Sequence, residues 1–545
     1  MPGSAGILPA WESKTAGKMP ALPGELDAAL DCRPSFGFVV VNRSAFLYPT
    51  RMTESAREPG KGCIGKKPMA YTNSRLGVIQ ECLLAILLTF GGLLAEGAES
   101  SPTDLPTSKP KGPPPKAIVL RGGTIFDSRR GLMVPDQTIL LRGDRIERIG
   151  PRRSFGKIPR EAQVFDVRGK FIIPGLIDAH VHLVHQLDDA HMTGDEVLPM
   201  FLAAGVTTIR DVGDTVVPQR LIARYAEAHA ESCPRVFLCS PLIDGAPPFH
   251  RDIGWALTDP EAVPAFVEDM AKWGVTTLKI YAGTPRAVGR RVIEEGHRRG
   301  LMVTAHLGPY RAEDAVADGI DCLEHIWSVF NYIISEEVRR IPDHRASLDL
   351  TNPLARSLTT NLVQRRVMVD PTLAVFRNMI LLNDLESVNQ HPDNAHAPAR
   401  LRQHWENYRR RAKLDPATLD VRRREFLKYQ ELTALLYRAG VPILAGTDTP
   451  EPFVPPGFSL LQELEMFVEA GLPPSAALQA ATINNARALK QESQLGSIEP
   501  GKLADLVILS ADPTADIHNV RRIEKVFRGG KVSAPAELLK KVPVQ

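Results

Sequence analysis

The stretch "FIIPGLIDAHVHLVH" at residues 171–185 decides how this sequence folds. It begins as an apolar run that is typical of a buried strand, yet it ends in Asp178, His180, His182 and His185. Because a strand alternates its faces, His180 and His182 point to the same side. Two neutral imidazoles on one side present their nitrogens to one point, which suits a divalent metal. An HxH pair alone is a weak signal, so the rest of the chain has to supply further ligands.

The sequence after this stretch alternates between strand-like and helix-like patterns. Helix-compatible segments such as 260–274 and 285–300 separate short apolar runs. This alternation predicts an α/β fold, a (β/α)8 TIM barrel that spans residues 174–489. We expect its strands near residues 172–182, 206–212, 235–242, 275–281, 301–307, 321–326, 367–372 and 442–448.

Short β-rich runs broken by Gly and Asp turns flank the predicted barrel. Residues 117–173 and 490–536 share this texture, which predicts one small composite β-sandwich built from both chain ends. Two insertions, 327–361 and 376–430, interrupt the barrel. The second has an excess of basic residues, which either form a solvated helix face or line a basic lid over the substrate entrance.

The first part of the chain needs separate treatment. Residues 1–68 are rich in Pro, Gly and Ser and predict a disordered or non-native N-terminal extension. Residues 69–98 begin with a Met and carry a single Arg75 before an apolar core, which predicts a signal peptide and an exported protein, periplasmic or extracellular. A signal-anchor helix is the alternative. Residues 99–116 predict a Pro-rich linker.

Bulk composition excludes several classes of protein. A hydrophobic content of 43% and a charged content of 24% are ordinary for a soluble globular protein. A formal charge of +3 gives no reason to expect nucleic acid as a partner. The cysteines show no CxxC spacing, so neither a zinc knuckle nor a disulfide scaffold is indicated. Cys233 and Cys239 either pair in an oxidising compartment or are two buried thiols.

Later predicted strands also end in side chains that can bind a metal. His306 closes "LMVTAHL", His325 lies in "DCLEHI", and Asp448 closes "VPILAGTD". Lys279 lies near the end of "VTTLKIY", inside an otherwise apolar run. Because the loops at the carboxyl ends of barrel strands build the active site, we expect these side chains to meet the two histidines of the first strand.

Taken together, these motifs resemble the amidohydrolase superfamily, in particular its imidazolonepropionase-like and prolidase-like (Xaa-Pro dipeptidase) branch. The resemblance covers about residues 117–536. Besides the ligand pattern, it rests on four stretches: "PGLIDAHVHL" at 174–183, "GVTTIRDVG" at 205–213, "SAALQAATINNARAL" at 475–489 and "GSIEPGKLADLVIL" at 496–509.

The resemblance implies two divalent metal ions, by expectation Zn²⁺, held by six side chains: His180, His182, Lys279, His306, His325 and Asp448. The first ion would lie between His180, His182 and Asp448. The second would lie at His306 and His325, with a carboxylated Lys279 as the bridge. Asp448 would accept a proton from a metal-bridging hydroxide and return it to the leaving amine. A plain Lys279 beside a single metal is the alternative.

Substrate-binding residues are less clearly marked. Arg210 and Tyr281 fall at the ends of predicted strands, where each could bind a substrate carboxylate or serve only in an ion pair or in packing. His250 lies in "DGAPPFH", where relatives often carry a Gly-Gly-His-Gly stretch that this chain lacks. Asp178 could orient a metal ligand or bond a turn backbone. His185 lies beyond the strand and is expected in a loop near the site.

We therefore expect a metal-dependent hydrolase that cleaves a C–N amide bond in a small-molecule amide or peptide. The substrate would be a dipeptide of the prolidase type or a cyclic amide. One alternative is a mononuclear enzyme that hydrolyses a cyclic ureide or deaminates a heterocycle. Another is a non-catalytic binding module, which predicts a lost ligand, whereas all six are present. We expect no nucleic acid partner and no stable membrane association beyond a signal anchor; a homo-oligomer is possible.

Overall fold

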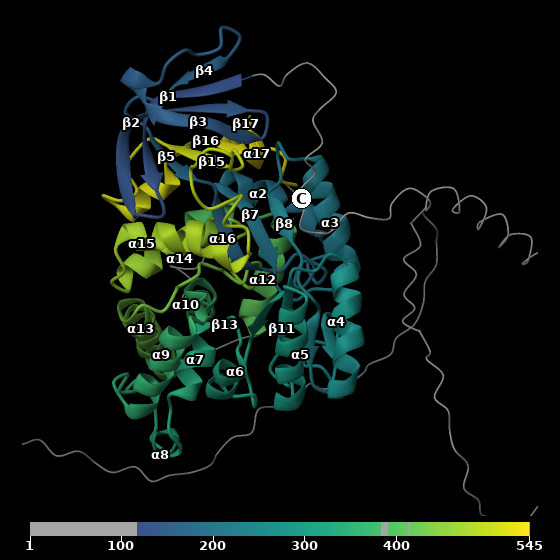
Figure 1. Ribbon diagram of the computed structural model, residues 1–545. Coiled ribbons are helices and arrows are strands. Elements are labelled where there is room, and N and C mark those ends of the chain that lie inside the picture. Colours follow the sequence, from purple (N-terminus) through teal and green to yellow (C-terminus); the bar gives the residue numbers. More distant parts are fainter. Residues whose placement is uncertain (1–116, 383–390, 412–414, 544–545) are drawn as a thin grey trace, which may run out of the picture. The chain divides into compact units, whose positions relative to one another are not determined.

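The computed structural model of the protein describes residues 117–382, 391–411 and 415–543 (Figure 1). All of them belong to the same structural unit. The segments predicted as N-terminal extension, signal peptide and linker, which end at residue 116, lie outside the described residues. In the described ranges, no helix combines the length and the apolar character that crossing a bilayer requires.

Short parallel strands form two sheets, and helices connect most of them in sequence, except that β8, β9 and β10 follow one another without a helix. Helical crossovers bring consecutive strands back in the same direction, which makes neighbours parallel. The smaller sheet has the order β6 (Leu176–Val181), β7 (Val206–Asp211) and β8 (Arg235–Phe237). The larger has the order β10 (Gly254–Ala256), β9 (Leu242–Asp244), β11 (Thr277–Ile280), β12 (Met302–Ala305), β13 (Cys322–Glu324) and β14 (Met368–Asp370). The α/β class predicted from the sequence is confirmed.

The edges of the two sheets are joined by single backbone bridges rather than by ladders. The isolated parallel bridges are Cys239–Thr277, Val181–Thr449 and Val369–Ile443. The prediction of a strand at 442–448 is wrong. This extended segment makes only scattered backbone hydrogen bonds, such as the bond of 2.9 Å from Leu444 N to Val369 O. The ladders therefore form two sheets and not one closed barrel.

The side chain of Asn485 adds to the scattered backbone bonds between β6 and the 442–449 segment. Its Nδ2 donates to Ile177 O at 2.7 Å and to Ala445 O at 2.8 Å, and its Oδ1 accepts from the N–H of Ala445 at 3.2 Å. Asn485 is fully buried and follows the π-helical turn Ala480–Asn484. These side-chain bonds act beside the backbone bonds from Ala179 N to Ala445 O at 3.0 Å and from His182 N to Thr449 O at 2.8 Å, and together they hold the 442–449 segment against β6.

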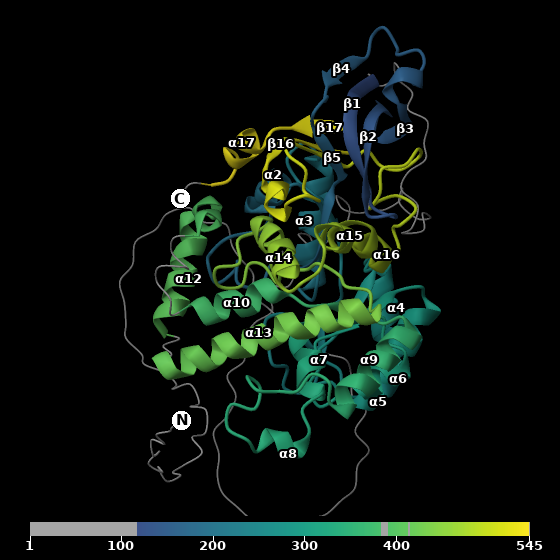
Figure 2. The ribbon, with the colours of Figure 1, turned by 90° about the vertical axis from the view of Figure 1, so that its left-hand side faces the viewer.

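Helices surround the parallel strands, and both predicted insertions are largely helical where the structure describes them (Figures 1 and 2). In Figure 2, α10 and α13 run alongside one another, and they are in contact. The α-helices are α2 (Leu198–Ala203), α3 (Val216–Ala228), α4 (Val263–Lys272), α5 (Arg286–Arg298), α6 (Ala312–Asp318), α7 (Ile326–Tyr332), α8 (Glu336–Arg339), α9 (Pro353–Arg365), α10 (Leu373–Leu381), α12 (Ala399–Arg411), α13 (Pro416–Ala439), α14 (Phe458–Glu469), α15 (Pro474–Gln479), α16 (Asn485–Ala488) and α17 (Pro535–Leu539).

Strands from both flanking segments pair in one mixed sheet. Its order is β17 (Lys531–Ser533), β16 (Ile523–Arg528), β15 (Leu506–Leu509), β5 (Phe171–Pro174), β1 (Ala117–Asp127), β2 (Leu132–Arg142) and β3 (Arg145–Pro151), while β4 (Gln163–Asp166) pairs with β1. Antiparallel pairing of β5 with β15 joins the two halves. The predicted union of both chain ends is thus seen as a single sheet, and the second layer of a sandwich stays a prediction.

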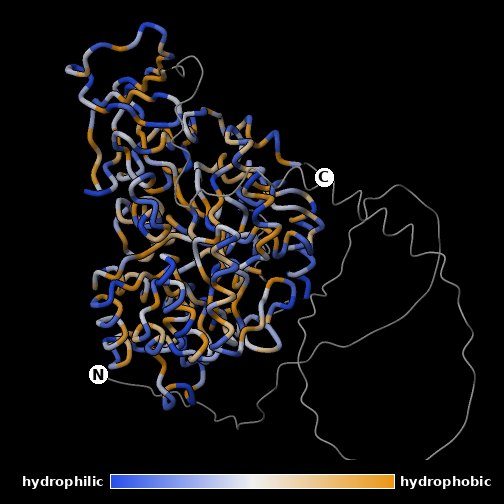
Figure 3. The backbone as a smooth tube through the Cα atoms, turned by 45° about the vertical axis from the view of Figure 1, so that its right-hand side comes forward, coloured by the Kyte–Doolittle hydropathy of each residue, from blue (hydrophilic) through white to orange (hydrophobic). Residues whose placement is uncertain are grey.

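Buried apolar side chains hold this sheet together, among them Leu120, Ile172, Leu506 and Phe527. Figure 3 shows that the outermost turns of the backbone are mostly hydrophilic.

Cys233 and Cys239 are buried and free, so they are two thiols and not a disulfide.

Candidate metal centre

A cavity of about 70 Å³ lies beyond the carboxyl ends of the parallel strands. Parallel strands end at the same edge, so residues far apart in the sequence meet there. All six predicted metal ligands line the cavity: His180, His182, Lys279, His306, His325 and Asp448. The predicted substrate residues Tyr281 and His250 line it too. Arg210 does not.

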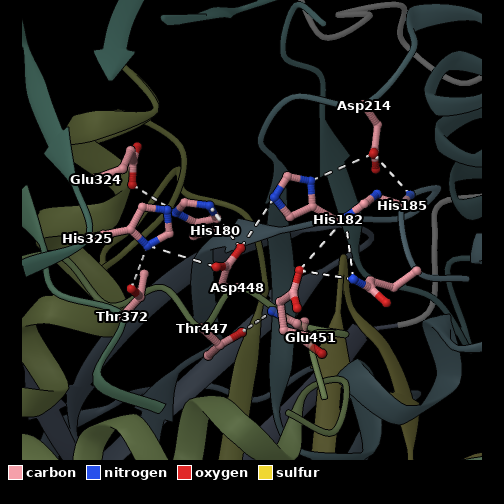
Figure 4. Close-up of polar contacts among 12 residues, drawn as sticks. His180, His182, His185, Asp214, Glu324, His325, Thr372, Thr447, Asp448 and Glu451 are labelled. Atoms are coloured by element: carbon pink, nitrogen blue, oxygen red, sulfur yellow. Dashed lines mark hydrogen bonds and ion pairs between the residues drawn. The ribbon is translucent and has the colours of Figure 1, made fainter. Parts of the chain in front are cut away.

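His180 and His182 converge on one carboxylate oxygen (Figure 4). The Nε2 atoms of His180 and His182 each lie 3.3 Å from Oδ1 of Asp448. Ligands of a tetrahedral metal at about 2.0–2.1 Å stand about 3.3–3.4 Å from one another, so this spacing is that of neighbouring ligands. Asp448 reaches the position because its backbone has a φ of 63° and its N–H donates to His180 O at 2.8 Å.

His306 and His325 form the opposite wall. Their ring centroids are 4.6 Å apart, and Nδ1 of His325 lies 3.9 Å from Oδ2 of Asp448. Burial lowers the pKa of His306 to about 3 and holds the pKa of His325 well below its usual range. Both imidazoles are therefore neutral near pH 7, which is the form that binds a metal.

Lys279 is the most unusual member of the set. Its side chain is 1% exposed, and its Nζ has no hydrogen-bond partner among the described residues. Burial lowers its pKa. A buried ammonium without a partner is costly, so this nitrogen lacks the contacts that a structural lysine would have. The unpartnered nitrogen fits a residue that is completed by a modification or by bound cations.

Two buried carboxylates that the sequence did not reveal hold the first histidine pair. Oε2 of Glu324 lies 2.9 Å from Nδ1 of His180. Asp214 accepts from the backbone N–H groups of Leu183 and Val184 at 2.7 and 2.8 Å, and its Oδ1 lies 3.7 Å from Nδ1 of His182. A hydrogen-bonded carboxylate fixes the ring orientation and tautomer of a metal-binding histidine, and Glu324 does so for His180. Asp214 is too far from Nδ1 of His182 for a hydrogen bond and acts there through its charge.

Arg210 is placed differently from the prediction. It is fully buried, and its guanidinium donates to Ala179 O at 2.5 Å and to Oε1 of Glu324 at 2.6 Å. The side chain therefore neutralises the carboxylate behind His180 and offers nothing to a substrate. The prediction that it binds a substrate carboxylate is not supported by this position.

Asp178 lies on the same face of β6 as His180 and accepts hydrogen bonds from a backbone N–H and a hydroxyl group. Its Oδ1 accepts from the N–H of His180 at 3.1 Å, and its Oδ2 accepts from the hydroxyl of Thr447 at 2.8 Å. These contacts match the structural alternative, because they tie β6 to the segment that carries Asp448. Burial raises its pKa to about 8.

Comparison with known proteins identifies the family of this chain. The model of the amidohydrolase family matches residues 171–533. The chain belongs to the amidohydrolase family.

The relatives of this amidohydrolase include imidazolonepropionases and prolidase-like structures. The imidazolonepropionase of Pseudomonas syringae pv. tomato is 25% identical over 396 residues, which is 71% of this chain and 90% of that protein. The enzyme of the same name from Geobacillus kaustophilus is 40% identical over 101 residues, which is 18% of this chain, and this match spans only 24% of that protein. A crystal structure of a putative prolidase from Bifidobacterium longum has a TM-score of 0.59 and 26% identity, and covers 79% of this chain and 100% of that one. The family resemblance predicted from the motifs is confirmed.

On the substrate side of this amidohydrolase, two predicted residues contact each other. Nε2 of His250 lies 3.0 Å from the hydroxyl of Tyr281. Burial raises the pKa of Tyr281, so its hydroxyl stays a donor. Glu451, which the sequence did not reveal, also lines the cavity, and burial together with nearby Asp448 raises its pKa to about 7.

The second insertion of this amidohydrolase packs beside the cavity loops. Nε2 of His404 in α12 lies 2.7 Å from Oε1 of Gln186, in the loop after β6. Trp405 is fully buried and donates to Pro450 O at 2.9 Å, two residues beyond Asp448. This helix is therefore anchored to the loops that build the site and is not merely a solvated surface.

Proposed function

We propose that this amidohydrolase cleaves a C–N amide bond in a small amide or peptide with the help of two divalent metal ions. A dipeptide of the prolidase type or a cyclic amide is the substrate class. One observation carries the proposal: four imidazoles, a carboxylate and an unpartnered buried lysine line one cavity of about 70 Å³. The names of the relatives, imidazolonepropionase and prolidase, support both substrate types.

The donor set fits two cations. His180, His182 and Asp448 would hold the first, and His306 and His325 the second. Lys279, as a neutral amine, would add to CO₂ and lose a proton to become a carbamate. This anion has two oxygen donors and gives the buried nitrogen the partners it lacks. Bound divalent cations supply Lewis acidity, which polarises a carbonyl and makes water a nucleophile at neutral pH.

The side chains of the cavity then have separate tasks. Asp448 takes the proton of the attacking water as the new C–O bond forms, and delivers it to the amine nitrogen as the C–N bond breaks. Tyr281, held by His250, offers a hydroxyl donor at the cavity wall for the substrate carbonyl or carboxylate. Glu324 keeps the His180 ring aimed at the carboxylate of Asp448, and Asp214 places a negative charge beside the His182 ring.

We further infer that the two parallel sheets are parts of the predicted eight-stranded barrel, with the 442–449 segment in the place of the last strand. The three isolated bridges support this arrangement, because together they link the sheets and that segment in the order of a ring.

Metal content measured by elemental analysis tests the proposal. We expect about two divalent ions per chain in the wild type and a clear loss in Lys279→Met, whereas the exposed control Lys272→Met keeps both. Lys272 is a suitable control because its side chain is 66% exposed and pairs only with neighbouring acids of its helix. A panel of Xaa-Pro dipeptides, N-acyl amino acids and cyclic amides then identifies the substrate. A single ion that is indifferent to Lys279→Met would refute the bridged site.

A further inference from the structure

A second cluster of ligand-type side chains lies at the entrance of the cavity. His185, His250 and Asp252 each offer one ligand atom, and these atoms lie within 4.8 Å of one another. His185 and His250 line the cavity, whereas the Asp252 side chain is 60% exposed. The cluster therefore stands between the predicted metal ligands and the solvent.

One pair in the cluster already has the spacing of two ligands of one ion. Nδ1 of His185 lies 3.2 Å from Oδ2 of Asp252, close to the ligand–ligand distance of a tetrahedral zinc site. The rings of His185 and His250 are 4.8 Å apart between centroids. Two imidazoles and a carboxylate with open positions left over are a common donor set for a divalent ion of borderline softness.

The remaining ring nitrogens have partners of their own. Nε2 of His185 lies 3.8 Å from Oε1 of Glu451, and Nε2 of His250 lies 3.0 Å from the Tyr281 hydroxyl. A histidine that binds a metal through one nitrogen has its ring fixed by a partner on the other. The Tyr281 hydroxyl thus holds the His250 ring, and Nδ1 of His185 faces the Asp252 carboxylate.

We propose that His185, His250 and Asp252 form an additional divalent-cation site, which binds Zn²⁺ more weakly than the centre in the cavity and inhibits the enzyme when it is filled. Binding rests only on the cluster, while inhibition also rests on the proposed function. An ion there occupies His250 and blocks the path past Tyr281. It also adds positive charge beside the predicted cations, which explains weaker binding.

Equilibrium dialysis against Zn²⁺, followed by elemental analysis, tests the site without any substrate. Asp252→Asn removes the exposed ligand and leaves the cavity intact. Asp189→Asn removes the same charge from another exposed position in the loop after β6 and serves as the matched control. We expect the wild type and Asp189→Asn to bind a third equivalent of Zn²⁺. The affinity for this third ion should be lower by about tenfold or more in Asp252→Asn. His185→Gln should weaken it as well.

Activity gives the second readout. Excess Zn²⁺ should inhibit the wild type and Asp189→Asn, and the inhibition should shift to about tenfold higher zinc or more in Asp252→Asn. A third equivalent with equal affinity in Asp252→Asn, or no third equivalent in the wild type, overturns the proposal. Absence of the first two equivalents would instead refute the proposed function, so the two failures are distinguishable.

Discussion

Two lysines of this chain are buried almost completely, and their surroundings are opposite. Lys502, at 4% exposure in the turn before β15, donates from Nζ to Glu492 O at 2.6 Å, to Leu495 O at 3.3 Å and to the Ser497 hydroxyl. Lys279, at 1% exposure in β11, has no such partner among the described residues. Burial lowers the pKa of both.

The difference distinguishes a lysine that stabilises the fold, Lys502, from one whose contacts suggest a role in the site, Lys279. A buried charge is stable only where hydrogen-bond acceptors compensate for the hydration that it loses. The turn around Lys502 supplies those acceptors from its own backbone. Around Lys279 the neighbours are imidazoles and Asp448, which are themselves suited to cations. The two positions therefore predict opposite effects of the same substitution.

The largest effect is expected for Lys279→Met. Loss of the proposed bridging ligand should lower kcat/KM about 10³-fold or more, since Lewis-acid stabilisation is worth several kcal/mol. The free energy of unfolding of the metal-free protein should stay the same or rise, because the variant removes an unpartnered buried amine at similar volume. Activity assays and urea unfolding measure the two. A strongly destabilised variant would show that Lys279 is structural after all.

Lys502→Met should do the reverse. Its three acceptors lose a shared donor, so the free energy of unfolding should fall by about 3 kcal/mol. Metal content and kcat/KM of the folded enzyme should not change. Unfolding in urea beside elemental analysis gives both numbers, and a loss of metal would erase the contrast between the two lysines.

Glu324→Gln tests whether the partners of the histidines matter as much as the ligands. The neutral amide of the variant offers Nδ1 of His180 no negative charge, so metal affinity should fall about 10–100-fold. Glu463→Gln is the control, since Glu463 is fully buried but accepts only from Leu373 N and Ala374 N. Competition with a chelator measures the affinity; equal losses in both variants would point to a general structural effect.

The smallest effect is expected for Thr372→Val, which removes the hydroxyl 2.8 Å from Nδ1 of His325. A neutral partner orients the ring but adds no charge, so the loss of metal affinity should be about tenfold at most. Thr433→Val removes a buried hydroxyl bonded to Tyr429 O and should leave the affinity unchanged. An effect larger than that of Glu324→Gln would reverse the ranking.

Much of the site followed from the sequence because strand alternation is local. It placed His180 and His182 on one face, and the ends of later strands brought Lys279, His306 and His325 to the same cavity. Seven of the eight predicted strands contain a strand of the structure. The eighth does not, because the backbone bonds of the 442–449 segment are too scattered to form a ladder.

What the sequence could not predict depends on backbone turns and long-range contacts. Alternation puts the neighbours Glu324 and His325 on opposite faces, yet His325 has a φ of 64°, so both lie beside His180. Arg210 was expected at the surface of the cavity. Its side chain instead lies buried behind His180, because it binds Glu324, which is 114 residues further along the sequence. Asp214 and Glu451 acquire their roles through loop conformations that leave no periodic signal.

The amide of Asn485 also bears on how the site opens. Its three hydrogen bonds, each worth about 1 kcal/mol net, and scattered backbone bonds to β6 and β14 hold the segment that carries Asp448, in place of a continuous ladder. Local opening then costs far less than global unfolding. We expect the segment that carries Asp448 to exchange its amide protons faster than the strands that carry the histidines. Under the proposed function, ions would load and leave through a fluctuation of this one short segment while the rest of the fold stays closed.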